Sequence, residues 1–283
     1  MAANRPVTVV VDSTADIPAD LGRSLGITVV PLMVRFGDRT YADGVDLGPD
    51  EFLRLLQESS TLPQTSQPPV SAFEEVFRRA LDAGNDVVCV TIASQLSGTY
   101  NSARLAAEAV DSSRIRLLDS GTVTMQLGWA AIAAARAAQA GLGADEVVAA
   151  AQSNLQRSRL FAVLETLEYV YRGGRIGRAA QLVGSMLSIK PILTVENGEV
   201  VPLERVRTWR RAIERLVDLT RQEAPLESLA VMHAGNLSDA QAIADRLRDL
   251  VPPEQLIFTQ AGPVLATYAG PGALGVMPVK AAQ

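Results

Sequence analysis

Cysteine and histidine, the side chains that most metal sites and many catalytic sites use, are almost absent from this sequence. The 283-residue chain holds one cysteine, Cys89, and one histidine, His233. An internal disulfide needs two cysteines, and a tetrahedral zinc site needs several clustered Cys and His ligands, so both are excluded. The one Gly-x-Ser-x-Gly match, residues 22–26, lies at the end of the expected helix Ala19–Leu25 and not at a strand-to-helix turn, so no elbow that would expose a nucleophilic serine is expected. A hydrolase or a zinc enzyme is therefore not expected.

Positive charge and aromatic rings are also scarce. The formal net charge is −5 and the isoelectric point is about 5.1. Nucleic-acid binding depends on a basic surface, so a general nucleic-acid binder is not expected. Aromatic residues make up 5% of the chain and hydrophobic residues 48%. Aliphatic side chains must therefore build the core and line any apolar cavity.

Long apolar runs are missing as well. The apolar run Val7–Val11 ends at Asp12 and is shorter than the apolar region of a secretory signal. The Ala-rich segment Trp129–Ala140 carries Arg136, and no stretch is long enough to span a bilayer. We expect a soluble, cytoplasmic protein, with Cys89 as a buried thiol in a strand.

The hydrophobic pattern predicts an α/β protein with two domains. In the first half, β-branched runs alternate with helical patterns, as in a mostly parallel sheet flanked by helices. The expected strands are Val7–Val11, Val29–Val34, Val87–Ile92 and Ile115–Leu118. The expected helices are Ala19–Leu25, Glu51–Gln57, Phe73–Leu81, Ser102–Val110 and Gln126–Ala140, with a capping box at Ser71 and Glu74 before the third. These elements define an N-terminal domain over residues 1–155.

A different pattern begins after this point and predicts a C-terminal α+β domain over residues 156–264, with a largely antiparallel sheet. Two short apolar runs flank Asn197-Gly198, which is typical of a β-hairpin. We expect a helix over Leu182–Met186, and further helices and strands at Thr208–Gln222, Ser228–His233, Ala240–Leu250 and Gln255–Thr259. The tail, residues 265–283, is expected to return to the first domain.

Polar loops follow three of the expected parallel strands, after Val11, Ile92 and Leu118. Ligands of such sheets bind at the carboxyl ends of the strands. The loop after Ile92 gathers Ser97, Gly98 and Thr99 directly before a helix, where free backbone N–H groups favour an anion. Helix capping by Ser97 or Thr99 explains the same residues equally well. Asp12 and Asp119, in the other two loops, are expected to hold the loops rather than to bind a metal.

Several other segments carry weaker signals. The loop Gln64–Pro69 leaves Thr65 and Ser66 free to project, and His233 is expected to be a structural turn residue. Gly270–Gly275 formally matches a dinucleotide fingerprint, but no βαβ unit can follow it, so we expect close backbone packing there instead. An arginine-rich set could recognise a phosphate group or an acidic partner, or could form a solvated face. Its members are Arg172, Arg175, Arg178, Arg205, Arg207, Arg210 and Arg211.

Taken in order, six segments closely resemble the DegV family over nearly the whole chain. They are Val11–Thr14, Thr65–Pro68, Leu96–Tyr100, Gly173–Gly177, Ile189–Leu193 and Gly270–Gly275. Each segment is weakly diagnostic alone, and their joint order and spacing are specific. The resemblance implies a protein that binds a long-chain fatty acid, such as palmitate or oleate, and that is no enzyme itself. Some members of the family are the acid-binding subunit of a bacterial fatty acid kinase.

The resemblance also implies a head-group site between the domains. It assigns the carboxylate to the hydroxyls of Thr65 and Ser97, with Ser66 and the Gly98 amide as helpers, and the acyl chain to an apolar tunnel. Members often have a histidine near the carboxylate, where this chain has Tyr268, which can donate a hydrogen bond but carries no positive charge. Candidate tunnel residues are Leu182, Val183, Met186 and Leu187.

The arginines named above are then candidates for facing the kinase or a phosphate, in particular Arg172, Arg175, Arg178, Arg205 and Arg207. No cofactor is expected, and a transient contact with a membrane surface stays open. Two alternatives also stay open. One is a stand-alone Mg²⁺-dependent enzyme acting on a small anionic substrate, with Asp12 or Asp119 as general base or metal ligand. The other is a lipid carrier without a kinase partner.

Overall fold

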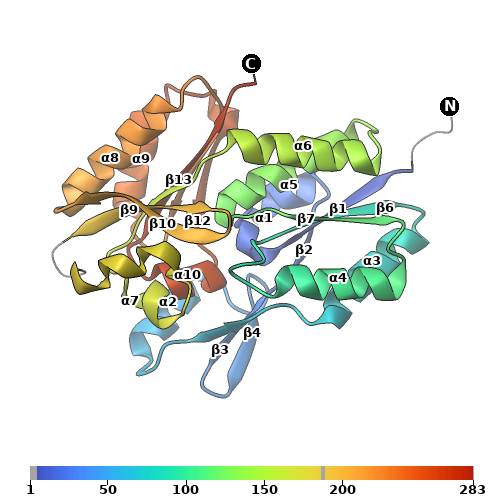
Figure 1. Cartoon of the computed structure of the whole chain (residues 1–283), viewed down its shortest axis with the longest axis horizontal. Helices are drawn as coiled ribbons and strands as arrows, with labels where there is room; N and C mark the ends of the chain where they lie inside the picture. Colours follow the sequence, from blue (N-terminus) through green and yellow to red (C-terminus); the bar gives the residue numbers. More distant parts are fainter. Residues whose placement is uncertain (1–4, 186–188, 283) are drawn as a thin grey trace. The chain divides into compact units, whose positions relative to one another are not determined.

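The computed structural model describes residues 5–185 and 189–282 and divides into two compact units. Unit 1 comprises the described residues up to Met33 together with Ser66–Gln156. Unit 2 comprises Val34–Thr65 together with the described residues from Arg157 onward. In Figure 1, unit 2 therefore combines blue ribbon from early in the chain with yellow to red ribbon from its second half. The prediction of an α/β fold with one parallel and one largely antiparallel sheet is confirmed.

A parallel sheet with strand order β2-β1-β6-β7 forms the centre of unit 1. Its strands are β1 (Val7–Asp12), β2 (Thr28–Val30), β6 (Asp86–Thr91) and β7 (Ile115–Asp119). The register places Cys89 of β6 opposite Val10 of β1 and Leu117 of β7. Cys89 is completely buried, and burial raises the pKa of its thiol well above the usual value. The prediction of a buried strand thiol is confirmed.

Helices cover both faces of this sheet. They are α1 (Ala19–Ser24), α3 (Val70–Asp82), α4 (Thr99–Val110), α5 (Thr124–Gln139) and α6 (Ala144–Arg157), with a short 3₁₀ helix, η1 (Ser13–Ala15), after β1. Figure 1 shows α3 and α4 on one side of the sheet and α5 and α6 on the other. On the first side, Phe73 and Phe77 of α3 and Ala103 of α4 pack in one core with Val10 and Cys89.

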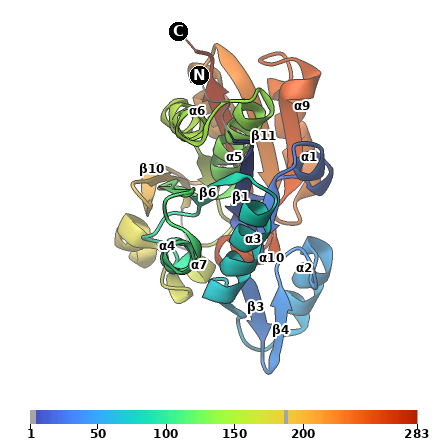
Figure 2. The ribbon, with the colours of Figure 1, turned by 90° about the vertical axis from the view of Figure 1, so that its right-hand side faces the viewer.

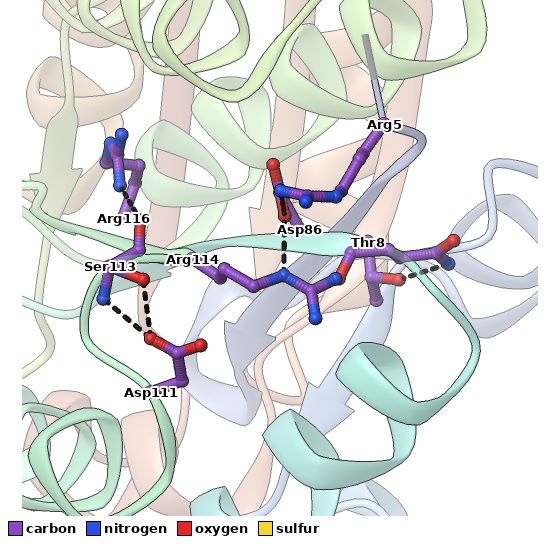
Figure 3. Close-up of polar contacts among 8 residues, drawn as sticks. Arg5, Thr8, Asp86, Asp111, Ser113, Arg114 and Arg116 are labelled. Atoms are coloured by element: carbon purple, nitrogen blue, oxygen red, sulfur yellow. Dashed lines mark hydrogen bonds and ion pairs between the residues drawn. The ribbon is translucent and has the colours of Figure 1, made fainter.

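Charged side chains close the amino end of the parallel sheet, as Figure 3 shows. Asp86, the first residue of β6, pairs with Arg114 at 3.0 Å and with Arg5 at 3.7 Å. Arg114 also donates to the carbonyl oxygen of Asn85 at 2.7 Å, and the Asn85 amide donates to Thr8 of β1 at 3.0 Å. These contacts join the beginnings of β1, β6 and β7. The polar loops predicted to form a site follow the opposite, carboxyl ends of the same strands.

Unit 2 contains a mixed sheet with strand order β10-β9-β8-β13-β11-β12 and a smaller sheet with strand order β4-β3-β5. The strands of the mixed sheet are β8 (Phe161–Val163), β9 (Lys190–Glu196), β10 (Glu199–Val206), β11 (Leu226–His233), β12 (Leu256–Gln260) and β13 (Leu274–Lys280). The smaller sheet is formed by β3 (Met33–Phe36), β4 (Arg39–Ala42) and β5 (Gln64–Ser66). Within the described part of the mixed sheet, β11 and β12 pair in parallel, and the other neighbouring strands pair antiparallel.

Helices of unit 2 pack against these sheets. They are α2 (Pro49–Glu58), α7 (Glu168–Arg172), α8 (Trp209–Gln222), α9 (Leu237–Leu247) and α10 (Pro263–Ala269), with 3₁₀ helices η2 (Gly177–Ser185) and η3 (Pro253–Gln255). Leu216 of α8 and Ile243 of α9 share a core with Leu229 of β11. Figure 2 shows β3 and β4 (blue) side by side, as neighbouring strands of the smaller sheet.

The domain boundaries differ from those expected. The break near residue 155 agrees with the change of unit after Gln156, but residues 34–65 group with unit 2 instead of with the first domain. The tail also differs, because β13 pairs with β11 and β8 inside the mixed sheet of unit 2 and does not return to the parallel sheet. Apolar strand β13 completes that core, where Leu274 and Val276 are buried.

Three local predictions were wrong. The expected strand over residues 29–34 is two strands, β2 and β3, since Pro31 between them has no N–H group to donate to a sheet. Ser71 does not cap α3, which begins at Val70 with Pro69 as its N-cap. The segment expected as a helix through Leu182 is the 3₁₀ helix η2. Met186 and Leu187, two candidate tunnel residues, lie outside the described residues.

Candidate functional site

Asp12 joins two loops at the carboxyl end of the parallel sheet in unit 1. Its carboxyl group accepts hydrogen bonds from the backbone N–H of Ile92 at 2.7 Å and from that of Thr14 at 3.0 Å. The Thr14 hydroxyl donates to it at 2.5 Å. Asp12 is completely buried, and burial raises the pKa of this carboxyl group to about 6, although the hydrogen bonds oppose the rise.

The loop after β7 is joined to the loop after β6 in the same way. Asp119, at the end of β7, accepts from the N–H of Ser94 at 3.2 Å and from that of Gly121 at 3.0 Å. The N–H of Ala93 donates to the carbonyl oxygen of Thr122 at 2.9 Å. The predicted meeting of these loops at one sheet edge is confirmed, and both aspartates hold backbone. Across residues 5–185 and 189–282, no group of three or more His, Cys, Asp or Glu side chains could hold a metal ion.

Ser97, Gly98 and Thr99 form the entry to α4. Gly98 is the N-cap residue and leaves the helix start without a side-chain cap. The Ser97 hydroxyl accepts from the N–H of Thr99 at 3.3 Å and lies 2.8 Å from the Thr99 hydroxyl. Ser97 is half-buried, Gly98 is exposed, and Thr99 is buried. The Ser97 hydroxyl and the N–H groups at a helix start that have no acceptor within the helix can donate to an anion at this point.

The polar segment Ser66-Gln67 approaches this helix entry within unit 1. A Cβ atom placed on Gly98 would lie 3.0 Å from Nε2 of Gln67, so the glycine admits the glutamine side chain. Both Ser66 and Gln67 are exposed. The structure therefore brings two of the predicted segments together. Gln67 was not among the predicted site residues, although it stands in the quoted motif between Ser66 and Pro68.

In unit 2, Thr65 and Tyr268 form a direct hydrogen bond. The Thr65 hydroxyl, in the middle of β5, lies 2.5 Å from the phenol oxygen of Tyr268 on α10. The two residues are 203 positions apart in the chain. Both side chains are half-buried. Tyr268 thus contacts the residue to which the resemblance assigns the carboxylate.

The Tyr268 ring is in close contact with the Gly173–Arg175 segment. A Cβ atom on Gly173 would lie 2.6 Å from Cδ1 of Tyr268, so only glycine fits there without displacing the ring. The Arg175 guanidinium lies over the ring, 5.4 Å from its centroid, and donates to the carbonyl oxygen of Gly173 at 2.8 Å. Sequence reasoning assigned Arg175 to a phosphate or a kinase and did not identify its contact with Tyr268.

The other candidate arginines are exposed and lie on different elements. Arg172 pairs with Glu168 one turn earlier in α7 at 3.1 Å, and Arg178 pairs with Glu196 at 3.3 Å. Arg205 and Arg207 are exposed on and just after β10, an edge strand of the mixed sheet.

The glycines of the Gly270-Pro271-Gly272 turn permit close packing, as expected. Both have positive φ, 74° and 83°. A Cβ atom on Gly270 would overlap the ring of Tyr169, and one on Gly272 would lie 2.8 Å from Cγ of Glu165. Glu165 is in turn held by Lys190, whose Nζ lies 2.6 Å from Oε2. This turn therefore fixes the path of the chain from α10 into β13.

His233 has a structural role, as predicted. Its Nδ1 accepts from the N–H of Gly235 at 3.3 Å, and its ring lies against Phe258 with centroids 5.5 Å apart. Burial lowers the pKa of the imidazole, against the opposing charge of Asp50. Leu182, one of the candidate tunnel residues, is buried.

No helix within the described ranges is long and apolar enough to cross a membrane.

Comparisons with known proteins give a consistent result. The sequence profile described as "Uncharacterised protein, DegV family" matches residues 6–281. A DegV domain-containing protein of Streptomyces coelicolor is 39% identical over 279 residues, which cover 97% of this chain and 98% of that protein. A DegV family protein from Thermus thermophilus, whose structure is titled for fatty acid binding, has a TM-score of 0.90 and 30% identity, covering 97% of this chain and 99% of that one.

A second solved structure is that of DegV from Bacillus subtilis, described as a fatty acid binding protein. Its TM-score is 0.89 at 30% identity, covering 98% of this chain and all of that one. The profile match over nearly the whole length, the close relative and the shared fold lead to one conclusion. This chain belongs to the DegV family.

Proposed function

We propose that this protein binds a long-chain fatty acid by its carboxylate and presents it to a separate ATP-dependent kinase, which forms the acyl phosphate. The observation that carries the ligand class is the likeness, over nearly the full length, to two solved relatives described as binding fatty acids. We place the protein and its reaction in the cytoplasm.

The energetics of such a ligand fit the composition of the chain. Burying an acyl chain of about sixteen carbons at roughly 0.8 kcal/mol per CH₂ gives a gross gain on the order of 10 kcal/mol before ordering costs. An ionised carboxylate taken out of water would cancel much of this gain unless it received several hydrogen bonds. The acyl chain then supplies affinity, and the head-group residues preserve it.

The carboxylate, in this proposal, accepts hydrogen bonds from the hydroxyls of Thr65 and Ser97, with the Ser66 hydroxyl and the Gly98 amide as further donors. The Ser97 hydroxyl supports this assignment, because it lies at the start of α4, where helix N–H groups have no acceptor within the helix. Catalysis is left to the kinase. Asp12 and Asp119 accept hydrogen bonds from backbone N–H groups, which disfavours the alternative of a magnesium enzyme.

Titration with palmitate tests the head-group assignment. Thr65→Val and Ser97→Ala should each weaken palmitate binding by about tenfold, since each removes one donor to a charged acceptor. Ser71→Ala, which removes an exposed hydroxyl on α3, is the matched control and should bind as the wild type does. Wild-type protein that takes up neither palmitate nor oleate would refute the proposed function itself.

A kinase assay tests the partner. The protein, a fatty acid kinase from the same genome, ATP and oleate should together yield acyl phosphate. Exposed arginines favour an acidic partner by raising the rate of encounter. Arg205→Glu and Arg207→Glu should each slow acyl phosphate formation by about fivefold or more when this protein, and not the kinase, is limiting. Both variants should bind oleate as the wild type does. Arg39→Glu, on the exposed edge strand β4, carries the same charge change and should have no effect.

Acyl phosphate formation that is insensitive to both variants would remove these arginines from the proposal. A complete lack of product would support a carrier without a kinase.

A further inference from the structure

The contacts of Tyr268 suggest a specific role for this side chain. We propose that Tyr268 is a positioning residue that acts through Thr65: its phenol donates to the Thr65 hydroxyl and thereby directs the Thr65 proton to the ligand carboxylate. Gly173 and Arg175 hold the Tyr268 ring in the orientation that this requires. This inference rests on the proposed function, because it assigns a role within the same head-group site.

The direction of the hydrogen bond follows from the chemistry of the three groups. A carboxylate only accepts, and a threonine hydroxyl has a single proton to donate. When Thr65 donates that proton to the carboxylate, its oxygen must act as the acceptor toward Tyr268, 2.5 Å away. Tyr268 is then the donor of the pair. Consecutive hydrogen bonds of this kind polarise one another, so the Thr65 hydroxyl becomes a stronger donor.

The geometry around the ring explains why Tyr268 keeps this position. The backbone of Gly173 comes so close that any Cβ atom there would strike Cδ1 of the ring at 2.6 Å. The Arg175 guanidinium lies over the ring at 5.4 Å from its centroid and is itself fixed by its bond to the Gly173 carbonyl oxygen. A cation over the face of an aromatic ring is attracted to it. The Gly173-Gly174-Arg175 motif therefore orients the phenol toward Thr65.

This arrangement has a consequence for ligand selection. With Tyr268 as its donor, Thr65 is set to donate, which suits a carboxylate. A fatty alcohol of the same chain length can both donate and accept, and it carries no charge that the directed proton would stabilise. Tyr268 should therefore favour the acid over the alcohol, while the acyl chain contributes equally to both.

A double-mutant cycle with palmitate and hexadecanol as probes tests the proposal. Tyr268→Phe, which keeps the ring against Gly173 and Arg175, should weaken palmitate binding by about tenfold and change hexadecanol binding by less than about twofold. In a Thr65→Val background the same change should have an effect of less than about twofold on palmitate, because the residue through which Tyr268 acts is gone. Tyr171→Phe removes an exposed phenol from the adjoining segment and serves as the control.

A second variant tests how the ring is held. Gly173→Ala should displace the Tyr268 ring and reproduce the selective loss of palmitate affinity. Arg175→Lys, which keeps the charge, should retain more affinity than Arg175→Ala. The inference is overturned if Tyr268→Phe binds palmitate as the wild type does, if it weakens acid and alcohol equally, or if its effect is as large without Thr65. Failure of the wild type to bind palmitate would instead contradict the proposed function.

Discussion

Asp12 is a carboxyl group placed where water cannot reach it. It is completely buried and accepts hydrogen bonds from Thr14 and Ile92. Desolvation disfavours the carboxylate more than these bonds favour it, so the pKa rises from 3.8 to about 6. The unfolded chain keeps the ordinary value, and the folded protein therefore holds the proton more tightly. The stabilisation that this gives is present below pH 4 and is lost as the pH rises through about 6.

Asp12→Asn removes the titrating group and keeps its size and one acceptor oxygen. Between about pH 4 and about pH 7.5, the free energy of unfolding of the variant should rise relative to that of the wild type by roughly 2.5 kcal/mol, because only the wild type pays for a buried charge. Urea unfolding of both proteins at the two pH values measures this difference. A constant offset between the two proteins would show that the pKa of Asp12 is the same in the folded and the unfolded chain.

Single residues were only partly predictable. The loop-holding role of Asp12 and Asp119 followed from their places after parallel strands, because such loops meet at one edge. The bond between Thr65 and Tyr268 could not be derived from the pattern, since it joins residues 203 positions apart. Tyr268 stood out only as a departure from a family motif, and Arg175 only as a charge beside glycines.

At the scale of elements, α5 depends on a close approach to η1. A Cβ atom on Gly128 would lie 2.7 Å from the carbonyl oxygen of Ala15 and 3.1 Å from Cγ1 of Ile17. The backbone oxygen cannot move away without displacing η1, which follows directly after Asp12. The glycine therefore allows the buried helix to lie against the loop that carries the Asp12 contacts.

Gly128→Ala should therefore destabilise the fold by about 1–3 kcal/mol, as overpacking of a buried site does. Gly22→Ala in α1 is the matched control, because the nearest atom to its new Cβ lies at an ordinary 3.8 Å. That change should be neutral or stabilising by about 0.5–1 kcal/mol, since alanine favours helix. Thermal or urea unfolding of the two variants measures both effects. Equal stability of the two would contradict the close contact.

Elements with a strong local sequence signal were predicted correctly, and strands that depend on pairing with distant segments of the chain were not. Asn197 and Gly198 have the positive φ values, 50° and 79°, that the predicted hairpin turn requires, and β9 pairs with β10 around them. The predicted capping box does not form, because α3 already begins at Val70 with Pro69 as its N-cap, two residues before the N-cap position that Ser71 would need. Strand β13 was missed because its glycine-rich approach resembled a loop, and its pairing partners lie far away in sequence.

At the scale of the whole molecule, the sequence indicated two folding units but assigned residues 34–65 to the first, whereas the structure groups them with unit 2. Contacts remote in sequence hold this segment in unit 2. Asp50 accepts from the amide of Gln260 at 2.8 Å, and Asp43 accepts from the N–H of Val264 at 3.4 Å. No local periodicity predicts such pairs. They bear on the proposed head-group site, because the segment ends at Thr65 and helix α10 carries Tyr268.

Solvent extraction of the purified protein, followed by mass spectrometry, tests most directly whether the protein carries a long-chain fatty acid by its head group. We expect close to one equivalent of a long-chain acid per wild-type chain and clear depletion in a Thr65→Val/Ser97→Ala variant that folds normally. A wild-type extract free of fatty acid, together with no uptake of added palmitate or oleate, would contradict the proposed fatty acid binding.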